Sequence, residues 1–88
     1  MPLVRFSSHL IPATRGAREA TAAGATLRAV LDDLERQMPG FRFRVVDEQD
    51  AIRPHVNFFV NKDRVEAIDG VRLKEADVLS IFGSLSGG

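Results

Sequence analysis

The sequence predicts an α+β fold, in which a mixed sheet of four to five strands packs on one amphipathic helix. Three observations support this fold class. Apolar residues recur at helical spacing over residues 26–38. Segments on both sides of this helix alternate apolar and polar residues, as half-buried strands do. One helix with one apolar stripe is buried most economically against a single sheet.

The N-terminal segment is predicted to form a hairpin. Residues 2–7 alternate, with Val4 and Phe6 on one side, which indicates a first strand. Pro12 and Gly16 then mark a loop. Residues 17–23 are short enough to return beside the first strand, so we predict a second, antiparallel strand there.

The helix of residues 26–38 is the clearest element of the sequence. Thr26 is a favourable N-cap residue, and Pro39-Gly40 stops the helix. The apolar stripe, which we expect to lie in the core, consists of Leu27, Val30, Leu31, Leu34 and Met38.

The second half of the chain is predicted to be richer in strands. Residues 41–54 lack a long period, so we expect a loop-rich crossover. Residues 55–61 are read as a strand, followed by a turn at 61–63 and a short strand at 64–66. Residues 78–82 form the last strand. Alternation predicts that Val56, Phe58, Val60, Leu79 and Ile81 face inward.

The predicted order is strand, strand, helix, strand, short strand, strand. A right-handed crossover through the helix then leaves the first and last strands side by side at the sheet centre. This is the β-grasp arrangement. We assign residues 1–82 to this domain and residues 83–88 to a flexible tail.

Composition excludes several classes of function. Twelve Lys and Arg balance twelve Asp and Glu, so the chain lacks the basic excess that nucleic-acid or anionic-membrane binding needs. The absence of cysteine excludes disulfides, thiol catalysis and Cys-based zinc sites. No signal peptide or membrane span is recognisable. We therefore expect a cytoplasmic protein that binds neither nucleic acid nor membrane.

No catalytic or metal-binding motif is evident. His9 and His55 are isolated, without neighbours at ligand spacing, so they are read as surface or partner-contact residues rather than a metal pair or a general base. A phosphate-binding glycine loop, a zinc-protease motif and a Ser-His-Asp set are absent. We expect no catalytic residue, no metal and no activity as an enzyme.

The chain ends in "SIFGSLSGG", where a hydrophobic strand leads through a short tether to Gly87 and Gly88. Glycine pairs have no side chain to pack and lose much backbone freedom when ordered. One interpretation is a frayed terminus without a function. The other is that the terminus itself is the working part of the protein.

The whole chain resembles ubiquitin-like sulfur carriers of the MoaD/ThiS family. The segment "GATLRAVLDDLERQMPG" resembles the single helix of that family, and "VNFFVNKDRV" resembles its hairpin. The most specific match is "LKEADVLSIFGSLSGG", which combines a closing strand, a short tether and Gly-Gly. The entrance to the hairpin, "RPHVNFFVN", is similar to carriers that serve cysteine biosynthesis.

The resemblance implies a chemistry for the tail. An E1-like enzyme would adenylate the carboxylate of Gly88 with ATP and then convert it to a thiocarboxylate, which donates sulfur to an accepting synthase. Gly87 would allow the thin tail to enter the active site, residues 84–86, which include Leu85 and Ser86, would give reach, and Leu85 would also anchor the tether in a groove of the partner. ATP would belong to the activating enzyme, and no cofactor is expected on this chain.

A partner surface is predicted beside the tail. By period-two alternation, Phe59 and Phe82 point away from the helix, where two exposed aromatic rings would form an apolar patch. A one-residue slip in register would instead place both rings in the core. With one patch and zero net charge, we expect a monomer that docks transiently.

Three functional hypotheses remain open from the sequence. The first is the sulfur carrier, for cysteine, molybdopterin or thiamine biosynthesis. The second is a protein modifier joined through Gly88 to a lysine of another protein. The third is a β-grasp interaction module whose tail has no chemical function.

Overall fold

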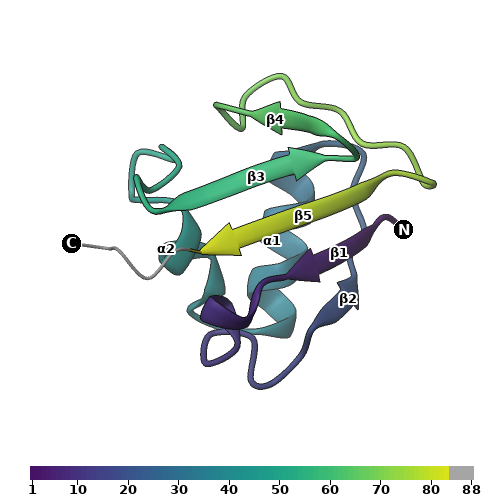
Figure 1. Ribbon diagram of the computed structural model, residues 1–88. Coiled ribbons are helices and arrows are strands. Elements are labelled where there is room, and N and C mark those ends of the chain that lie inside the picture. Colours follow the sequence, from purple (N-terminus) through teal and green to yellow (C-terminus); the bar gives the residue numbers. More distant parts are fainter. Residues whose placement is uncertain (84–88) are drawn as a thin grey trace.

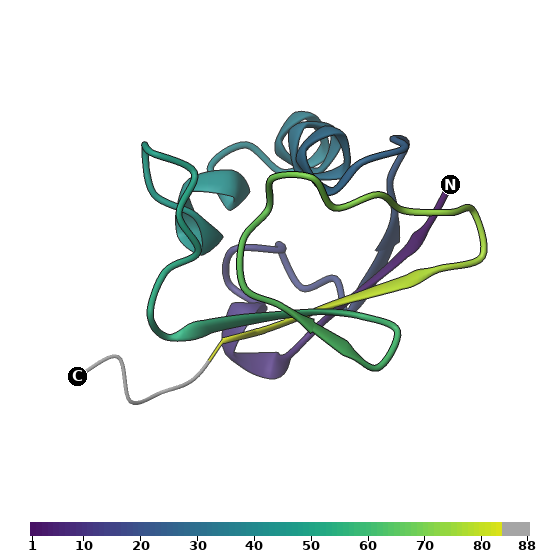
Figure 2. The same ribbon diagram turned by 90° about the horizontal axis from the view of Figure 1, so that it is seen from above.

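The computed structural model describes residues 1–83. It consists of a five-stranded mixed sheet with its α-helices on one face (Figure 1). The elements in chain order are β1 (Leu3–Phe6), the 3-10 helix η1 (Ser8–Leu10), β2 (Glu19–Thr21), α1 (Leu27–Gln37), α2 (Phe41–Val45), β3 (Val56–Val60), β4 (Asp63–Val65) and β5 (Val78–Gly83). Both α-helices lie on the same side of the sheet, so the opposite face carries no α-helix (Figure 2).

The strand order is β2-β1-β5-β3-β4. Strand β5 runs parallel to β1, with Leu3 opposite Val78 and Phe6 opposite Ile81, while the other neighbouring pairs are antiparallel. The first and last strands are therefore adjacent at the sheet centre, which confirms the predicted β-grasp arrangement. The β1–β2 hairpin is also confirmed.

Helix α1 follows the sequence prediction closely. The hydroxyl oxygen of Thr26 accepts a hydrogen bond from the backbone N–H of Ala29 at 3.1 Å, as an N-cap should. The stripe faces the sheet, and its buried members within the helix are Leu27, Val30, Leu31 and Leu34. Met38, just after the helix, is buried as well.

The alternation predicted for the strands sets the inner face of the sheet. Val4, Phe6, Val56, Phe58, Leu79 and Ile81 are all buried. Val60 is only partly buried, because it lies at the end of β3 beside the turn to β4. Strand β4 begins and ends one residue before the predicted segment, and β5 extends one residue further, to Gly83.

The predicted loop at residues 41–54 is wrong in its first part, because residues 41–45 form the short helix α2. Phe41 and Val45 stand four residues apart, so both reach the same face of this helix, and both are completely buried. The ring of Phe41 packs edge-on against Phe6, with the ring centroids 5.3 Å apart. The expectation of one helix is therefore corrected, for residues 1–83, to two α-helices and a 3-10 helix.

The start of α2 is held by a carboxylate from α1. Glu35 accepts hydrogen bonds from the backbone N–H groups of Gly40 and Arg42, each at 2.9 Å. These two hydrogen bonds lower the pKa of Glu35, that from Gly40 contributing most. Glu35 thus occupies backbone donors that α2 cannot satisfy internally.

Charged side chains tie the two helices to the neighbouring loops. Asp50 lies between Arg28 of α1 and Arg42 of α2 and pairs with both, at 2.9 Å from Arg42. Arg28 also pairs with Asp69, while Arg42 reaches Asp32 at 3.2 Å. Exposed ion pairs of this kind add little to stability, so the network fixes the position of α2 more than it stabilises the fold. Within residues 1–83, no helix is long and apolar enough to cross a membrane.

Candidate functional site

The predicted tail residues Leu85, Ser86, Gly87 and Gly88 lie outside the described residues. Strand β5 delivers the chain to them, and its last residue is Gly83. The geometry around Gly83 therefore determines where the tail leaves the domain.

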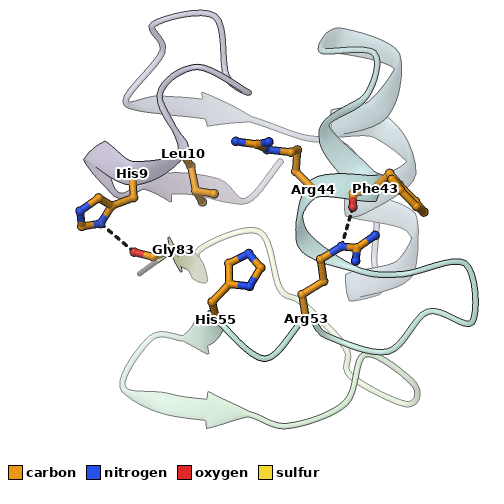
Figure 3. Close-up of a pocket in the computed structure, with 7 residues that line it drawn as sticks. All are labelled: His9, Leu10, Phe43, Arg44, Arg53, His55 and Gly83. Atoms are coloured by element: carbon orange, nitrogen blue, oxygen red, sulfur yellow. Dashed lines mark hydrogen bonds between the residues drawn. The ribbon is translucent and has the colours of Figure 1, made fainter. Parts of the chain in front are cut away.

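Both backbone groups of Gly83 are held by the segment that follows β1. Its N–H donates to the hydroxyl oxygen of Ser7 at 2.9 Å, and its carbonyl oxygen lies 2.9 Å from Nδ1 of His9 (Figure 3). A carbonyl oxygen can only accept, so Nδ1 of His9 carries the proton in this hydrogen bond. The end of β5 is thus anchored to η1.

Glycine at position 83 allows η1 to come close. A Cβ atom there would lie 3.1 Å from Cδ2 of Leu10, which is tighter than ordinary van der Waals contact. Leu10 is buried, so its side chain has little room to move away. The glycine that begins the predicted tail therefore has a packing role in the domain.

Phe59 and Phe82 lie together on the sheet face that carries no α-helix. Their ring centroids are 5.7 Å apart, within the range of favourable aromatic pairs, and Phe82 is 43% exposed. Phe59 is partly buried. Because Phe58 and Ile81, their chain neighbours, are completely buried, the register places both predicted patch residues on the outer face.

A shallow hollow of about 710 Å³ adjoins Phe82 on this face. Its polar lining includes Ser80 and the ion pair between Arg5 and Glu19, whose atoms lie 3.2 Å apart. The outer face thus offers an aromatic pair next to a polar rim, which is the usual composition of a protein interface.

A second cavity, of about 460 Å³, opens beside the end of β5; we call it the tail-exit cleft (Figure 3). It is lined by His9, Leu10, Phe43, Arg44, Arg53, His55 and Gly83. Figure 3 shows Arg44 of α2 and His55, which precedes β3, on opposite sides of the space that the cleft occupies. Within the part of the chain that the structure describes, the lining contains four nitrogen-bearing side chains and no carboxylate.

No pattern in the sequence brings these residues together. His9 and His55 are 46 positions apart, but both line the tail-exit cleft. Phe43, Arg44 and Arg53 were missed, because they belong to the segment read as a loop. The only sequence signal for these three residues was the basic and aromatic character of that segment. Their positions in space cannot be predicted without α2. Among residues 1–83, no three His, Asp or Glu side chains form a potential metal site.

The fold and the sequence of the C-terminal end together indicate the class of protein. A β-grasp domain whose central strand leads toward a Gly-Gly ending is typical of ubiquitin-like proteins. The sequence also matches the model of the ThiS family over residues 4–88. The chain belongs to the ThiS family, which confirms the resemblance found in the sequence.

Known proteins similar to this chain include a carrier and a modifier. It is 32% identical to the sulfur carrier protein CysO of Mycobacterium tuberculosis over 89 residues, covering 97% of this chain and 96% of that protein. It is 33% identical to the small archaeal modifier protein 3 of Haloferax volcanii over 66 residues, covering 73% and 71% of the two chains.

A solved structure shows the same fold. The crystal structure of the Amycolatopsis orientalis BexX/CysO complex contains a chain similar to this one with a TM-score of 0.87 and 27% identity, and the similarity covers 100% of both chains. The β-grasp assignment is therefore confirmed by structure as well as by sequence.

Proposed function

We propose that this protein is a sulfur carrier whose terminal glycine, Gly88, is converted to a thiocarboxylate. The observation that carries this proposal is the match to the ThiS family through residue 88, so that it includes the Gly-Gly ending. Its relative in Mycobacterium tuberculosis is a sulfur carrier protein, and the similarity covers nearly the whole of both chains.

The chemistry has two steps, both catalysed by an E1-like partner. In the first, a carboxylate oxygen of Gly88 attacks the α-phosphorus of ATP, and pyrophosphate leaves. In the second, a sulfide-level sulfur donor attacks the acyl carbon, and AMP leaves with the bonding electrons. The product is a thiocarboxylate, whose negatively charged sulfur is a nucleophile. The carrier is therefore a co-substrate and not the catalyst.

Each part of the tail has a physical role in this proposal. Gly87 and Gly88 have no side chains, so the backbone fits a narrow channel that other residues would block. Leu85 and Ser86 extend the reach of the tail, and Leu85 adds an apolar contact with the partner. The anchoring of Gly83 by Ser7 and His9 gives the tail a fixed point of departure.

The partner is expected to bind the outer sheet face at Phe59 and Phe82. The rings form an exposed aromatic pair at the strand that leads into the tail. The similar chain from Amycolatopsis orientalis was solved in a BexX/CysO complex, which supports association with a protein partner. The sulfur acceptor is proposed to be a biosynthetic synthase for cysteine, or else for molybdopterin or thiamine, and the carrier to be a cytoplasmic monomer.

The experiment is an intact-mass measurement of the full chain, with its native C-terminus, after incubation with ATP, sulfide and the activating enzyme of the same cell. A mass increase equal to the replacement of one oxygen by sulfur supports the proposal, and deletion of Gly88 should abolish it. An unchanged mass with every adenylating enzyme of that cell would contradict the carrier and favour a β-grasp interaction module.

A second candidate is a protein modifier. The similarity to the small archaeal modifier protein 3 favours it, and the same adenylation of Gly88 would precede it. The acyl carbon would then be attacked by a lysine amine, which gives an isopeptide bond with loss of AMP. A ladder of higher-mass conjugates in cell extract, absent without Gly88, would identify the modifier, while a sulfur-for-oxygen mass increase without conjugates identifies the carrier.

A further inference from the structure

The tail-exit cleft concentrates positive charge in a chain whose formal net charge is zero. Its charged or titratable lining residues come from three different regions: His9 from η1, Arg44 from α2, and Arg53 and His55 from the segment that leads into β3. Among residues 1–83, no carboxylate lines the cleft. Folding has therefore gathered like groups from separated parts of the chain, although like charges repel each other.

The two arginines of the cleft differ from the arginines that form ion pairs within the domain. Arg5, Arg28, Arg36 and Arg42 each pair with a carboxylate within 4.0 Å. In the described part of the chain, neither Arg44 nor Arg53 has such a partner. Neither charge is therefore neutralised by a direct ion pair among residues 1–83, although Arg53 is near enough to Asp47 to help lower the pKa of that carboxyl group.

Arg53 is held in position by Phe43. Its Nε donates to the carbonyl oxygen of Phe43 at 2.7 Å, and its guanidinium lies over the ring of Phe43, 4.4 Å from the centroid. This leaves the terminal nitrogens of the guanidinium as donors for an external acceptor. Phe43 itself is 59% exposed. An arginine side chain that is already fixed on an aromatic ring loses little conformational entropy when it binds an acceptor.

We propose that the tail-exit cleft binds an acidic segment of the protein partner that receives the tail. Asp or Glu side chains of that segment accept hydrogen bonds from the guanidinium groups of Arg44 and Arg53, with His55 beside them. Phe43 packs against the apolar parts of the same segment. An aromatic ring next to arginine is typical of protein interfaces, which favours a peptide segment over a small free anion as the occupant.

This inference rests on the proposed function only in that the partner is the protein that takes up the tail. The cleft and the Phe59–Phe82 pair use different residues, and both lie near the end of β5. A partner that binds both would contact the domain on two sides of the departing chain. Charge complementarity at the cleft would then raise the association rate and orient the tail.

The test is an NMR titration of the full, isotope-labelled chain with a hexaglutamate peptide at low salt. We expect shifts concentrated on the backbone amides of His9, Arg44, Arg53 and His55, which weaken as salt is added. The double variant R44E/R53E should bind the peptide at least about tenfold more weakly. R44E alone, which keeps the Arg53–Phe43 contact, serves if the double variant does not fold and should show a smaller loss in the same direction.

The matched control is the double variant K62E/R72E, which makes the same change in net charge at two exposed positions that do not line the cleft. When the variants are compared at about 0.15 M salt, where the Debye length is about 8 Å, it should retain the affinity of the native chain within about a factor of two, because charges outside the cleft are then largely screened from the peptide. An equal loss in both double variants would overturn the proposal, since the peptide would then respond to net charge alone.

A parallel titration with inorganic pyrophosphate separates a protein segment from a small anion. Tighter binding of pyrophosphate than of the peptide at the same residues would overturn the proposal in favour of a small-oxyanion site. Absence of localised shifts with the peptide would also overturn it. Neither result depends on sulfur loading, so failure of the cleft and failure of the carrier function are distinguishable.

Discussion

Nδ1 of His9 lies 2.9 Å from the carbonyl oxygen of Gly83 and donates its proton to it. The segment after the first strand thereby holds the end of the last one, 74 positions away in the sequence. Ser7 holds the N–H of the same glycine from the same segment. The point from which the tail departs is thus fixed by two side chains that belong to the other end of the chain.

Removing these anchors should loosen the end of β5. Ser7→Ala leaves the N–H of Gly83 without its acceptor, and His9→Ala frees the carbonyl. We expect each variant to lower the free energy of unfolding by about 1 kcal/mol. The exchange of the Gly83 amide with deuterium, followed by NMR, should accelerate in both. His55→Ala is the control, because His55 lines the same cleft but has no hydrogen bond to Gly83; equal acceleration there would contradict the anchoring role.

Replacing Phe82 tests the outer face as the partner surface. Phe82→Asp puts a charge into an exposed aromatic pair, and we expect a loss of about 2 kcal/mol in binding to the activating enzyme, roughly thirtyfold in affinity. The fold should survive, since the pair with Phe59 is worth about 1 kcal/mol. Isothermal titration calorimetry measures the affinity. Thr21→Asp adds the same charge on the exposed edge strand β2 and should leave binding unchanged.

Gly24 precedes α1 in a conformation that side chains rarely adopt, with φ of +147°. A Cβ atom there would lie 2.8 Å from the backbone nitrogen of Val30, which cannot move without distorting the helix. Gly24→Ala should therefore lower the free energy of unfolding by about 3 kcal/mol, from strain and clash together. Gly70→Ala is the matched control: its φ is +76° but its surroundings are open, so we expect about 1 kcal/mol. Urea denaturation of both variants measures the difference.

The protein should lose stability in acid. The pKa of Glu35 is lowered by hydrogen bonds from the backbone N–H groups of Gly40 and Arg42, and that of Asp77 chiefly by the N–H of Lys74. A carboxyl group whose pKa is lower in the folded than in the unfolded protein stabilises the folded state at pH values above its unfolded pKa. This stabilisation is lost as the pH drops through the pKa of the folded state. We expect the melting temperature to be flat near neutral pH and to fall below about pH 4.

The variant Asp77→Asn is the control for the expected loss of stability in acid. Asp77→Asn should lower the melting temperature at neutral pH, because an amide is a weaker acceptor for the N–H of Lys74 than a carboxylate. The same variant should lose less on acidification than the native chain, since it has one carboxylate fewer to protonate. An equal acid loss in the two proteins would show that Asp77 does not contribute to it.

Most of the fold could be predicted because its elements have clear periods. The spacing from Leu27 to Leu34 repeats with the helix, and the alternation around Phe58 and Ile81 repeats with the strands. Helix α2 has five residues, which is little more than one turn, so no period can emerge from it. It forms because Phe41 and Val45 are buried against the core and because Glu35 caps its start, and both causes are tertiary contacts.

The candidate site likewise has one part that could be predicted from the sequence and one part that could not. Phe59 and Phe82 could be placed on one face from alternation alone, because their strands are neighbours. The tail-exit cleft could not be predicted, since His9, Arg44 and His55 meet only after α2 has been positioned beside the end of β5. Such a cluster has no local pattern in the sequence. Only the tertiary fold brings its members together.

The parallel pairing of β1 with β5 has a practical consequence for labelling. Because the two strands run the same way, Leu3 lies beside Val78, at the opposite end of β5 from Gly83. The first residue is exposed there, where its ammonium group contacts Glu75. A fluorophore or a surface anchor attached ahead of Met1 is therefore held a full strand length from the tail exit. Immobilised in this way, the protein would present Gly83 and both candidate partner surfaces to the solution.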